Sequence, residues 1–346
     1  MLARLALVLC AAMSWGCASL QYLAQAGAGQ DDLVNRSQDI DRLLREDRLP
    51  PKTRRLIEEI PAVKRYGEAH GLRATHNYTK YARLDRDAAV WIVSGCEPLR
   101  FRSKTWSFPI VGTITYLGWF HLDDAKRAAD VLRKQGWDAD VRPAGAYSTA
   151  GWFDDPLLST MIGKGDDARG DLVNTVFHES THATFFVPGQ SRLNESVANF
   201  VGDSLAEEYM RDVAGADAKE TLAYFAAERR GAEREKLMQA AYSDLEALYA
   251  SSLPREEKLA EKAKILHALE TGLGTKRHLT NASLVQFKTY HSGEKELGEL
   301  LAGCSGDTRR LVATLVAFQH HPFPVDQADP AVILAPLVKE GCAAHP

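Results

Sequence analysis

Two histidines and a glutamate form the segment of this chain that is best suited to catalysis. His178, Glu179 and His182 follow the pattern His-Glu-X-X-His. On an α-helix, residues four apart lie on one face, so both imidazoles can reach a single metal ion. A carboxylate beside them can take a proton from a water on that metal. The spacing predicts a site for one zinc ion per chain, with His178 and His182 as ligands and Glu179 as general base.

The residues on either side of the pentapeptide predict that its helix is buried. Residues 172–177 and 183–187 are mostly apolar. A buried polar group without a partner costs about 1–3 kcal/mol, and a metal ion would supply such a partner. The alternative is a solvated helix face that carries two histidines and no metal. The apolar surroundings favour the metal site.

A short connection after the pentapeptide predicts a third ligand. The first helix should stop at Pro188, and Ser191 is a suitable N-cap for a second, antiparallel helix. At about 1.5 Å per residue, the second helix brings Glu195 back to the level of His182. A catalytic zinc usually takes three protein ligands and leaves a fourth position open. Glu195 is therefore the predicted third ligand, and its alternative is an ordinary glutamate in the first turn of a helix.

Two further polar residues follow on the second helix. Asn199 falls near the level of His178 and is predicted to support the ligands through a hydrogen bond. Asp203 lies further along the same helix and is a weaker alternative ligand.

The pattern of two histidines and a downstream Asn-Glu pair resembles the gluzincin metallopeptidases. Over most of its length the chain also resembles a bacterial family described as putative aminopeptidases. This resemblance implies a zinc-dependent peptidase fold, with His178, His182 and Glu195 as ligands. The interval between His182 and Glu195 is shorter than in the best-known gluzincins, so their loop contacts to substrate do not transfer. The stretches that carry the family resemblance are residues 16–22, 108–112, 146–161, 178–182 and 194–196.

Peptide hydrolysis also needs a donor for the oxyanion, commonly a tyrosine or a histidine. Tyr290 is the first candidate, followed by Tyr147 and His291. An aminopeptidase further needs an anionic group to bind the free α-amine of its substrate. The acidic residues that could do so, which the sequence does not rank, are Glu97, Asp154 and Asp155.

The N-terminus has the pattern of a bacterial lipoprotein signal. A short cationic start precedes an apolar run over residues 5–13, which is too short to span a bilayer. A small residue then stands before Cys17. We expect residues 1–16 to be removed and Cys17 to carry a lipid that anchors the protein in the cell envelope, with Ala18 favouring the periplasmic face of the outer membrane. The alternative is a plain secretory signal cut near Ala12 or Ala18.

Cysteine usage fits an exported chain, in which disulfides can persist. A bridge between Cys304 and Cys342 and a buried free thiol are equally good expectations, because connectivity cannot be deduced from sequence. The net charge of −4 and the absence of a basic run argue against nucleic acid as a partner. The partners we expect are a peptide substrate and, through Cys17, a membrane.

Hydrophobic periodicity predicts an α+β fold that is mostly helical, with a small N-terminal mixed sheet and a helical C-terminal half. The resemblance to zinc metallopeptidases implies that this fold is zincin-like. We expect a helical segment over residues 17–75 and a peptidase domain over residues 76–346. The strand at residues 110–116 is the candidate edge for binding a peptide by strand addition. The other predicted strands are residues 88–93 and 138–142, and the predicted helices are residues 34–49, 53–70, 123–135, 219–252 and 256–270.

Two classes of function remain open at this stage. The first is a lipid-anchored zinc peptidase, an aminopeptidase or alternatively an endopeptidase. The second is a non-enzymatic envelope lipoprotein that keeps a metallopeptidase fold for binding. Glu179 favours the first class, because a module that only binds metal has no need for a general base.

Overall fold

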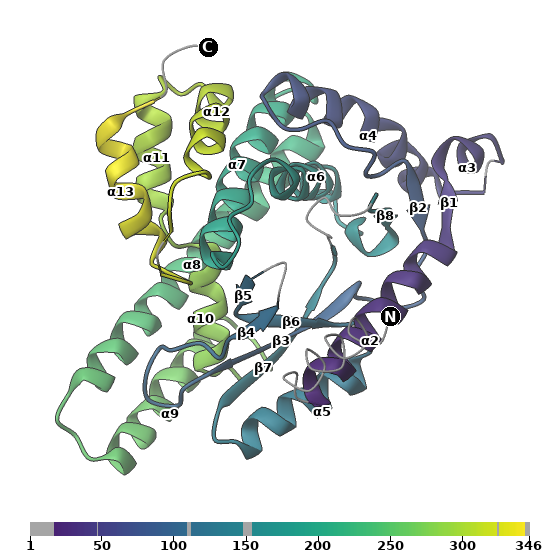
Figure 1. Ribbon diagram of the computed structural model, residues 1–346. Coiled ribbons are helices and arrows are strands. Elements are labelled where there is room, and N and C mark those ends of the chain that lie inside the picture. Colours follow the sequence, from purple (N-terminus) through teal and green to yellow (C-terminus); the bar gives the residue numbers. More distant parts are fainter. Residues whose placement is uncertain (1–16, 47, 109–111, 148–153, 324, 343–346) are drawn as a thin grey trace, which may run out of the picture.

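The structure is a computed structural model that describes residues 17–46, 48–108, 112–147, 154–323 and 325–342, with side chains described from residue 22 onward and that of Tyr290 excepted. The molecule is α+β and mostly helical, as the sequence predicts. In Figure 1, helices α6 (Ala168–Thr184) and α7 (Ser191–Asp212) lie next to each other, and small sheets lie below and to the right of them.

The N-terminal segment contains three helices, α2 (Cys17–Arg36), α3 (Ile40–Glu46) and α4 (Pro51–Ala69). The prediction of one helix over residues 34–49 is wrong, because strand β1 (Ser37–Asp39) interrupts it. The Ser37 hydroxyl donates to Leu33 O at 2.6 Å, and the backbone of Asp39 pairs with Lys80 of strand β2 (Lys80–Ala82). Side-chain and strand hydrogen bonds of this kind compete with helix formation.

The main sheet is antiparallel, with strand order β6-β3-β7. Its strands are β3 (Val90–Cys96), β6 (Tyr116–Trp119) and β7 (Asp138–Ala144), and helix α5 (Leu122–Lys134) connects β6 to β7. In a second sheet, β2 lies between β1 and the short strand β8 (Leu157–Leu158), which the 3₁₀ helix η1 (Ser159–Met161) follows. The predicted strands at residues 88–93 and 138–142 and the helix at 123–135 are therefore confirmed, with ends shifted by a few residues.

The predicted edge strand at residues 110–116 is two short strands. Strand β5 (Gly112–Ile114) forms a hairpin with β4 (Trp106–Phe108), and β6 begins at Tyr116 after the buried Thr115. Residues 110 and 111 lie outside the described part. In the described part, β6 pairs with β3 alone and is therefore an edge of the main sheet.

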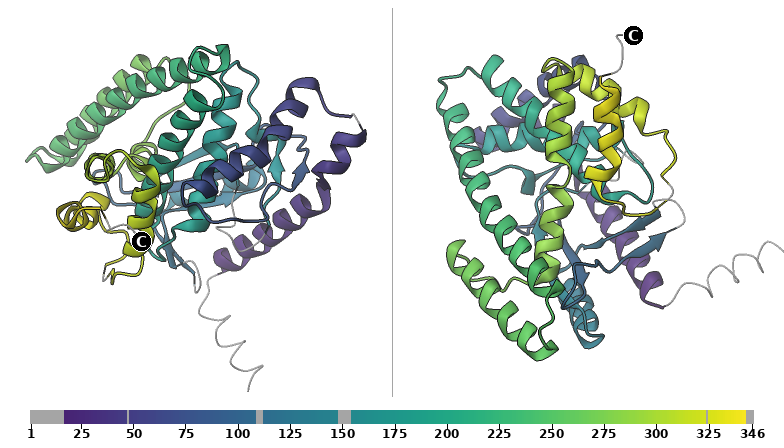
Figure 2. Two further views of the ribbon diagram at one scale, coloured as in Figure 1. Left: turned by 90° about the horizontal axis from the view of Figure 1, so that it is seen from above. Right: turned by 90° about the vertical axis from the view of Figure 1, so that its left-hand side faces the viewer.

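The second half of the chain is helical, as predicted. Helices α8 and α9 are the two predicted charged helices, and they project from the rest of the molecule as an antiparallel pair (Figure 2). The helices of this half are α6 (Ala168–Thr184), α7 (Ser191–Asp212), α8 (Lys219–Ala250), α9 (Arg255–Gly272), α10 (Asn281–Tyr290), α11 (Glu294–Gly303), α12 (Thr308–Phe318) and α13 (Pro330–Glu340).

Helices α6 and α7 pack against each other at the centre of the largest hydrophobic core. Gly202 of α7 allows this close approach, because a side chain there would meet the backbone of His178. Cys304 and Cys342 form a disulfide that ties the end of α11 to the segment after α13. None of the described helices is both long and apolar enough to cross a membrane.

Candidate metal centre

The pentapeptide lies on helix α6, as its spacing predicts. Val176 and Phe177 are buried on the core side of this helix, and Glu179 is 8% exposed. The apolar residues that flank the motif therefore place it inside the molecule, where a polar cluster needs a partner.

The connection between α6 and α7 differs from the predicted one. Helix α6 ends at Thr184 and not at Pro188, and a segment that begins with the extended residue Phe185 leads to a turn at residues 188–189. Asn194 of α7 holds this extended segment: its Oδ1 accepts from Val187 N, and its Nδ2 donates to Val187 O, both at 2.9 Å. Because the segment after α6 continues to Val187, which lies beside Asn194 near the start of α7, Glu195 still returns to the level of the two histidines.

Ser191 is not the N-cap of α7. It is the first residue of the helix, and Gln190 precedes it without a side-chain cap. The Ser191 hydroxyl instead donates to Gln327 Oε1 at 2.8 Å. Gln327 also donates to Thr113 O and Gly189 O, which holds strand β5 against the turn between the two helices.

Three ligand atoms converge on one point between α6 and α7. His178 Nε2 and His182 Nε2 are 3.1 Å apart, and Glu195 Oε2 lies 3.6 and 3.7 Å from them. Two neutral imidazoles and one carboxylate are the donor set of many catalytic zinc sites. The residues that the sequence proposed as ligands are therefore brought together and could hold one divalent cation.

The charges in this cluster suit a cation. Burial alone would raise the pKa of Glu195, but the two imidazoles outweigh it and lower that pKa well below its ordinary value. Burial alone would lower the pKa of His182, yet Glu195 and Glu179 raise it. Each group thus stabilises the charge of the other, and a metal ion could take the place of the proton on the histidines.

Glu179 has an oxygen without a partner. Its Oε2 atom is buried and makes no hydrogen bond to any described residue. A buried carboxylate oxygen of this kind needs an explanation, such as a water molecule or a metal site beside it. Glu179 is next to His178 in the chain, and its unpaired Oε2 is what we expect of a carboxylate that contacts a water in a metal centre.

Tyr116 is a site residue that the sequence did not single out for this role. Its hydroxyl donates to Glu195 Oε1 at 2.6 Å, which leaves Oε2 turned to the histidines. Hydrogen bonds of this kind orient metal ligands. Only the fold brings Tyr116 of strand β6 to helix α7, so no local signal could have identified it.

The polar residues further along α7 are not ligands in this arrangement. Asp203 accepts a hydrogen bond from Asn174 Nδ2 at 2.7 Å and is absent from the group of ligand atoms. Burial raises the pKa of Asp203, although the hydrogen bond from Asn174 and the nearby His178 oppose this shift. Asn199 has interaction partners of its own, and its predicted support of the histidines stays a prediction.

The three residues predicted as oxyanion donors differ in whether their side chains are described and in what they contact. The side chain of Tyr290, the last residue of α10, lies outside the described part of the structure. Tyr147 packs against Phe120 with ring centroids 5.1 Å apart, and burial raises its pKa to about 12. His291 belongs to a second cluster, described next.

Glu235, His291 and Glu294 form a second group that could hold a metal ion among the described residues. His291 Nδ1 lies 2.6 Å from Glu294 Oε1 and 3.7 Å from Glu235 Oε1. Burial alone would lower the pKa of His291, but the two carboxylates raise it. The carboxylates are 42% and 47% exposed, so an ion pair on the surface explains this group without a metal.

Exposure and contacts distinguish the three residues that were considered for binding the α-amine of a substrate. Glu97 forms an ion pair with Arg102. Asp154 is exposed, whereas Asp155 is 2% exposed. Asp155 O accepts from Tyr78 N at 2.8 Å, and the charges of Asp155 and Glu179 both act on Tyr78. Asp155 is therefore the candidate that shares a neighbour, Tyr78, with the predicted base.

Tyr78 is a second residue that the sequence did not indicate. It has a φ of 64°, an uncommon backbone conformation for a tyrosine, and it is 5% exposed. Burial, with the charges of Glu179 and Asp155, raises its pKa well above the ordinary value. Strained backbone of this kind clusters at functional sites. A single sequence does not indicate that a tyrosine adopts a left-handed backbone conformation.

Comparison with known proteins identifies the family of this chain. The family described as "putative aminopeptidase" matches residues 21–327, which is most of the chain and includes every residue of the metal centre. No curated protein and no solved structure matches the chain. The match over residues 21–327 shows that the chain belongs to the putative aminopeptidase family.

Proposed function

We propose that this protein is a zinc-dependent peptidase that acts on the N-terminal end of peptides. The observation that carries the proposal is the convergence of His178, His182 and Glu195 beside the orphaned carboxylate oxygen of Glu179. The family supports peptide hydrolysis, and the ligand geometry supports a metal. The fold that we propose is zincin-like, with the ligand pattern of the gluzincins.

In this mechanism His178, His182 and Glu195 would hold zinc, which would supply Lewis acidity and lower the pKa of a water toward neutrality. Glu179 takes the proton of the attacking water and later delivers it to the leaving amine. Tyr116 keeps Glu195 in its orientation through the 2.6 Å hydrogen bond. Tyr78, on which the charge of Glu179 acts, can donate a hydrogen bond to the oxyanion, and Tyr290 is the donor that the sequence predicts for the same role.

The cellular setting is part of the proposal. A lipid on Cys17 would anchor the protein in the cell envelope, at the periplasmic face of the outer membrane. The basis is the signal-like pattern of residues 1–16 and the cysteine that follows it. The disulfide between Cys304 and Cys342 is compatible with an oxidising compartment.

The test is peptide hydrolysis by the purified soluble protein, followed by mass spectrometry of the products of a mixed peptide library. We expect zinc-dependent cleavage by the wild type. Glu179→Gln should keep zinc and lose at least about 10²-fold in rate, because the proton acceptor is gone. Unchanged turnover in this variant would contradict the mechanism.

The same peptide library distinguishes an aminopeptidase from an endopeptidase and from a non-enzymatic protein. Cleavage inside peptides would indicate an endopeptidase. No cleavage of any peptide by the zinc-loaded wild type would favour the non-enzymatic envelope protein that uses the fold only for binding.

A further inference from the structure

The loop between helix α4 and strand β2, residues 70–79, contains Tyr78, on which the charge of Glu179 acts. Tyr78 has a φ of 64° and is 5% exposed. This backbone conformation is costly for a tyrosine, and it persists only where the surrounding structure enforces it. The contacts that enforce it should lie in the loop or next to it.

Lys64 of helix α4 binds the backbone of this loop. Its Nζ atom donates to Thr75 O and to Asn77 O, both at 2.7 Å. A charged donor makes stronger hydrogen bonds than a neutral one. Asn77 O belongs to the planar peptide group that joins Asn77 to Tyr78, so its hydrogen bond to Lys64 fixes one side of Tyr78.

Asn77 adds a second anchor through its side chain. Its Oδ1 atom accepts from Asp155 N at 3.0 Å, and Tyr78 N donates to Asp155 O at 2.8 Å. Asn77 is 3% exposed, so water does not compete for this hydrogen bond. The peptide group between Asn77 and Tyr78 is therefore bound at both ends, at its carbonyl by Lys64 and at its N–H by Asp155 O.

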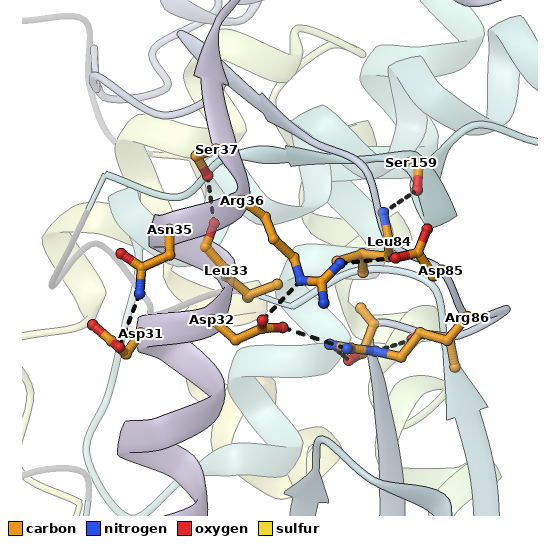
Figure 3. Close-up of polar contacts among 12 residues, drawn as sticks. Asp31, Asp32, Leu33, Asn35, Arg36, Ser37, Leu84, Asp85, Arg86 and Ser159 are labelled. Atoms are coloured by element: carbon orange, nitrogen blue, oxygen red, sulfur yellow. Dashed lines mark hydrogen bonds and ion pairs between the residues drawn. The ribbon is translucent and has the colours of Figure 1, made fainter.

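The chain after Tyr78 is held by contacts that do not involve Lys64. It enters strand β2, which pairs with β1 and β8. Beyond β2, Leu84 N donates to Ser159 Oγ at 2.9 Å, and Arg36 lies 3.0 Å from Asp85 Oδ2, as Figure 3 shows. Loss of the Lys64 ammonium group should therefore alter the loop before Tyr78 and leave the second sheet intact.

The same loop contacts the helix that carries the pentapeptide. Arg73 N donates to Thr184 Oγ1 at 2.9 Å, and Thr184 is the last residue of α6. A small cavity between α4, α6 and the loop is lined by Lys64 and by Ser180, the residue after Glu179. The loop therefore lies along α6 close to the predicted base.

The Tyr78 side chain ends in a hydroxyl that has no hydrogen-bond partner among the described residues. Glu179 Oε2 is without a partner in the same part of the chain. One of these groups can donate a hydrogen bond and the other can accept a proton. Together they suit a ligand that needs both, and a peptide carbonyl under attack by water is such a ligand.

We propose that Lys64 and Asn77 are positioning residues, which hold Tyr78 so that its hydroxyl donates a hydrogen bond to the carbonyl oxygen of the substrate. An oxyanion donor is most effective when it is fixed before the reaction, because no stabilisation is then lost to reorientation. Both hydrogen bonds of Lys64 go to the loop, so its effect on the rate should pass through Tyr78. The inference rests on the proposed peptidase function, and it gives the N-terminal helical segment a role in catalysis.

The first experiment is a double-mutant cycle with Lys64→Met and Tyr78→Phe on a peptide that the wild type cleaves. Methionine is a good helix former, so α4 should be kept. Tyr78→Phe should lower kcat about 10²-fold and change KM by less than about threefold, because the hydroxyl acts in the transition state. Lys64→Met should lower kcat at least about tenfold in the wild type and by less than about twofold in Tyr78→Phe.

Two results of the cycle would overturn the inference. Full kcat in Tyr78→Phe would show that this hydroxyl does not act on the substrate. Losses that multiply in the double variant would show that Lys64 does not act through Tyr78.

Lys52→Met is the matched control on the same helix. Lys52 Nζ also donates to a backbone carbonyl, Gly165 O at 2.5 Å, in a different loop. Lys52→Met should leave kcat unchanged, and a loss equal to that of Lys64→Met would contradict a specific role for Lys64. Asn77→Ala removes the second anchor and should lower kcat as Lys64→Met does, which keeps the test valid if one of these variants misfolds.

Fluorine NMR separates this inference from the proposed function, because it needs no turnover. The protein is labelled with 3-fluorotyrosine, and Tyr78→Phe identifies the resonance of Tyr78. Lys64→Met and Asn77→Ala should shift this resonance, whereas Lys52→Met should leave it in place. An unchanged resonance in Lys64→Met refutes the positioning role even if the wild type is an active peptidase. A wild type that cleaves no peptide refutes the peptidase and a catalytic Tyr78, and the resonance then still decides whether Lys64 positions this residue.

Discussion

At the scale of single residues, the candidate metal centre consists of three side chains from two helices, and Tyr116 donates a hydrogen bond to one of them, Glu195. The spacing of His178 and His182 is local to one helix, so their convergence follows from helix geometry. The prediction of Glu195 required a comparison of its height along the second helix with the height of His182 along the first helix. Tyr116 and Tyr78 come from segments far away in the chain, and only the tertiary fold brings them to the site.

Tyr116 gives a test of orientation at this scale. Tyr116→Phe removes the hydrogen bond to Glu195 Oε1, so the carboxylate is held less firmly toward the histidines. We expect zinc affinity, measured by competition with a chromogenic chelator, to fall about tenfold. Tyr249→Phe removes a similar hydroxyl contact, to Asn281 in another part of the molecule, and should leave zinc affinity unchanged. Equal affinities for the two variants would show that Tyr116 does not orient the ligand.

At the scale of elements, periodicity and the placement of proline and glycine were sufficient to predict α4, α5, α8 and α9. Helix α4 begins at Pro51, and α5 is followed by Gly136 with a φ of 85°, as its sequence predicts. The predicted helix at residues 34–49 failed because strand pairing with β2 competes with it. The end of α6 was missed because Asn194 stabilises an extended segment where the sequence still looks helical.

Asn194 gives the test at this scale. Asn194→Ala leaves the buried N–H of Val187 without a partner and leaves Val187 O with the 3.2 Å hydrogen bond from Gln190 N alone. An unpaired buried group costs about 1–3 kcal/mol, and the second lost hydrogen bond adds to this cost. We expect the free energy of unfolding in urea to fall by about 2–4 kcal/mol. Asn35→Ala removes an exposed hydrogen bond to Asp31 and should change stability by less than about 0.5 kcal/mol. A fall of similar size in both variants would argue against a special role for Asn194.

At the scale of the whole molecule, composition and periodicity predicted an α+β, mostly helical chain. They did not predict which acidic side chains from different helices lie close together. Burial, with Asp203 and Asp171, raises the pKa of Glu228 to about 7, and burial raises that of Asp171 to about 6. These carboxyls come from α6, α7 and α8, so their crowding depends on how the three helices pack.

This crowding predicts a pH dependence of stability. Between the unfolded pKa of Glu228, near 4.5, and its folded pKa of about 7, the folded state binds more protons, so stability falls as the pH rises. Glu228→Gln should remove this loss and be more stable than the wild type at pH 8 by about 1–2 kcal/mol, after allowance for solvent screening. Urea unfolding at pH 4.5 and pH 8 checks it. A difference that is the same at both pH values would contradict the assignment.

The most direct test of the metal centre is the zinc content of three purified proteins after equilibration with zinc and gel filtration. The wild type should hold about one zinc per chain. Glu195→Ala should lose most of it, whereas Glu294→Ala, which removes one carboxylate from the second His-Glu cluster, should keep it. Full zinc in Glu195→Ala, or loss in Glu294→Ala alone, would contradict a metal centre built by His178, His182 and Glu195.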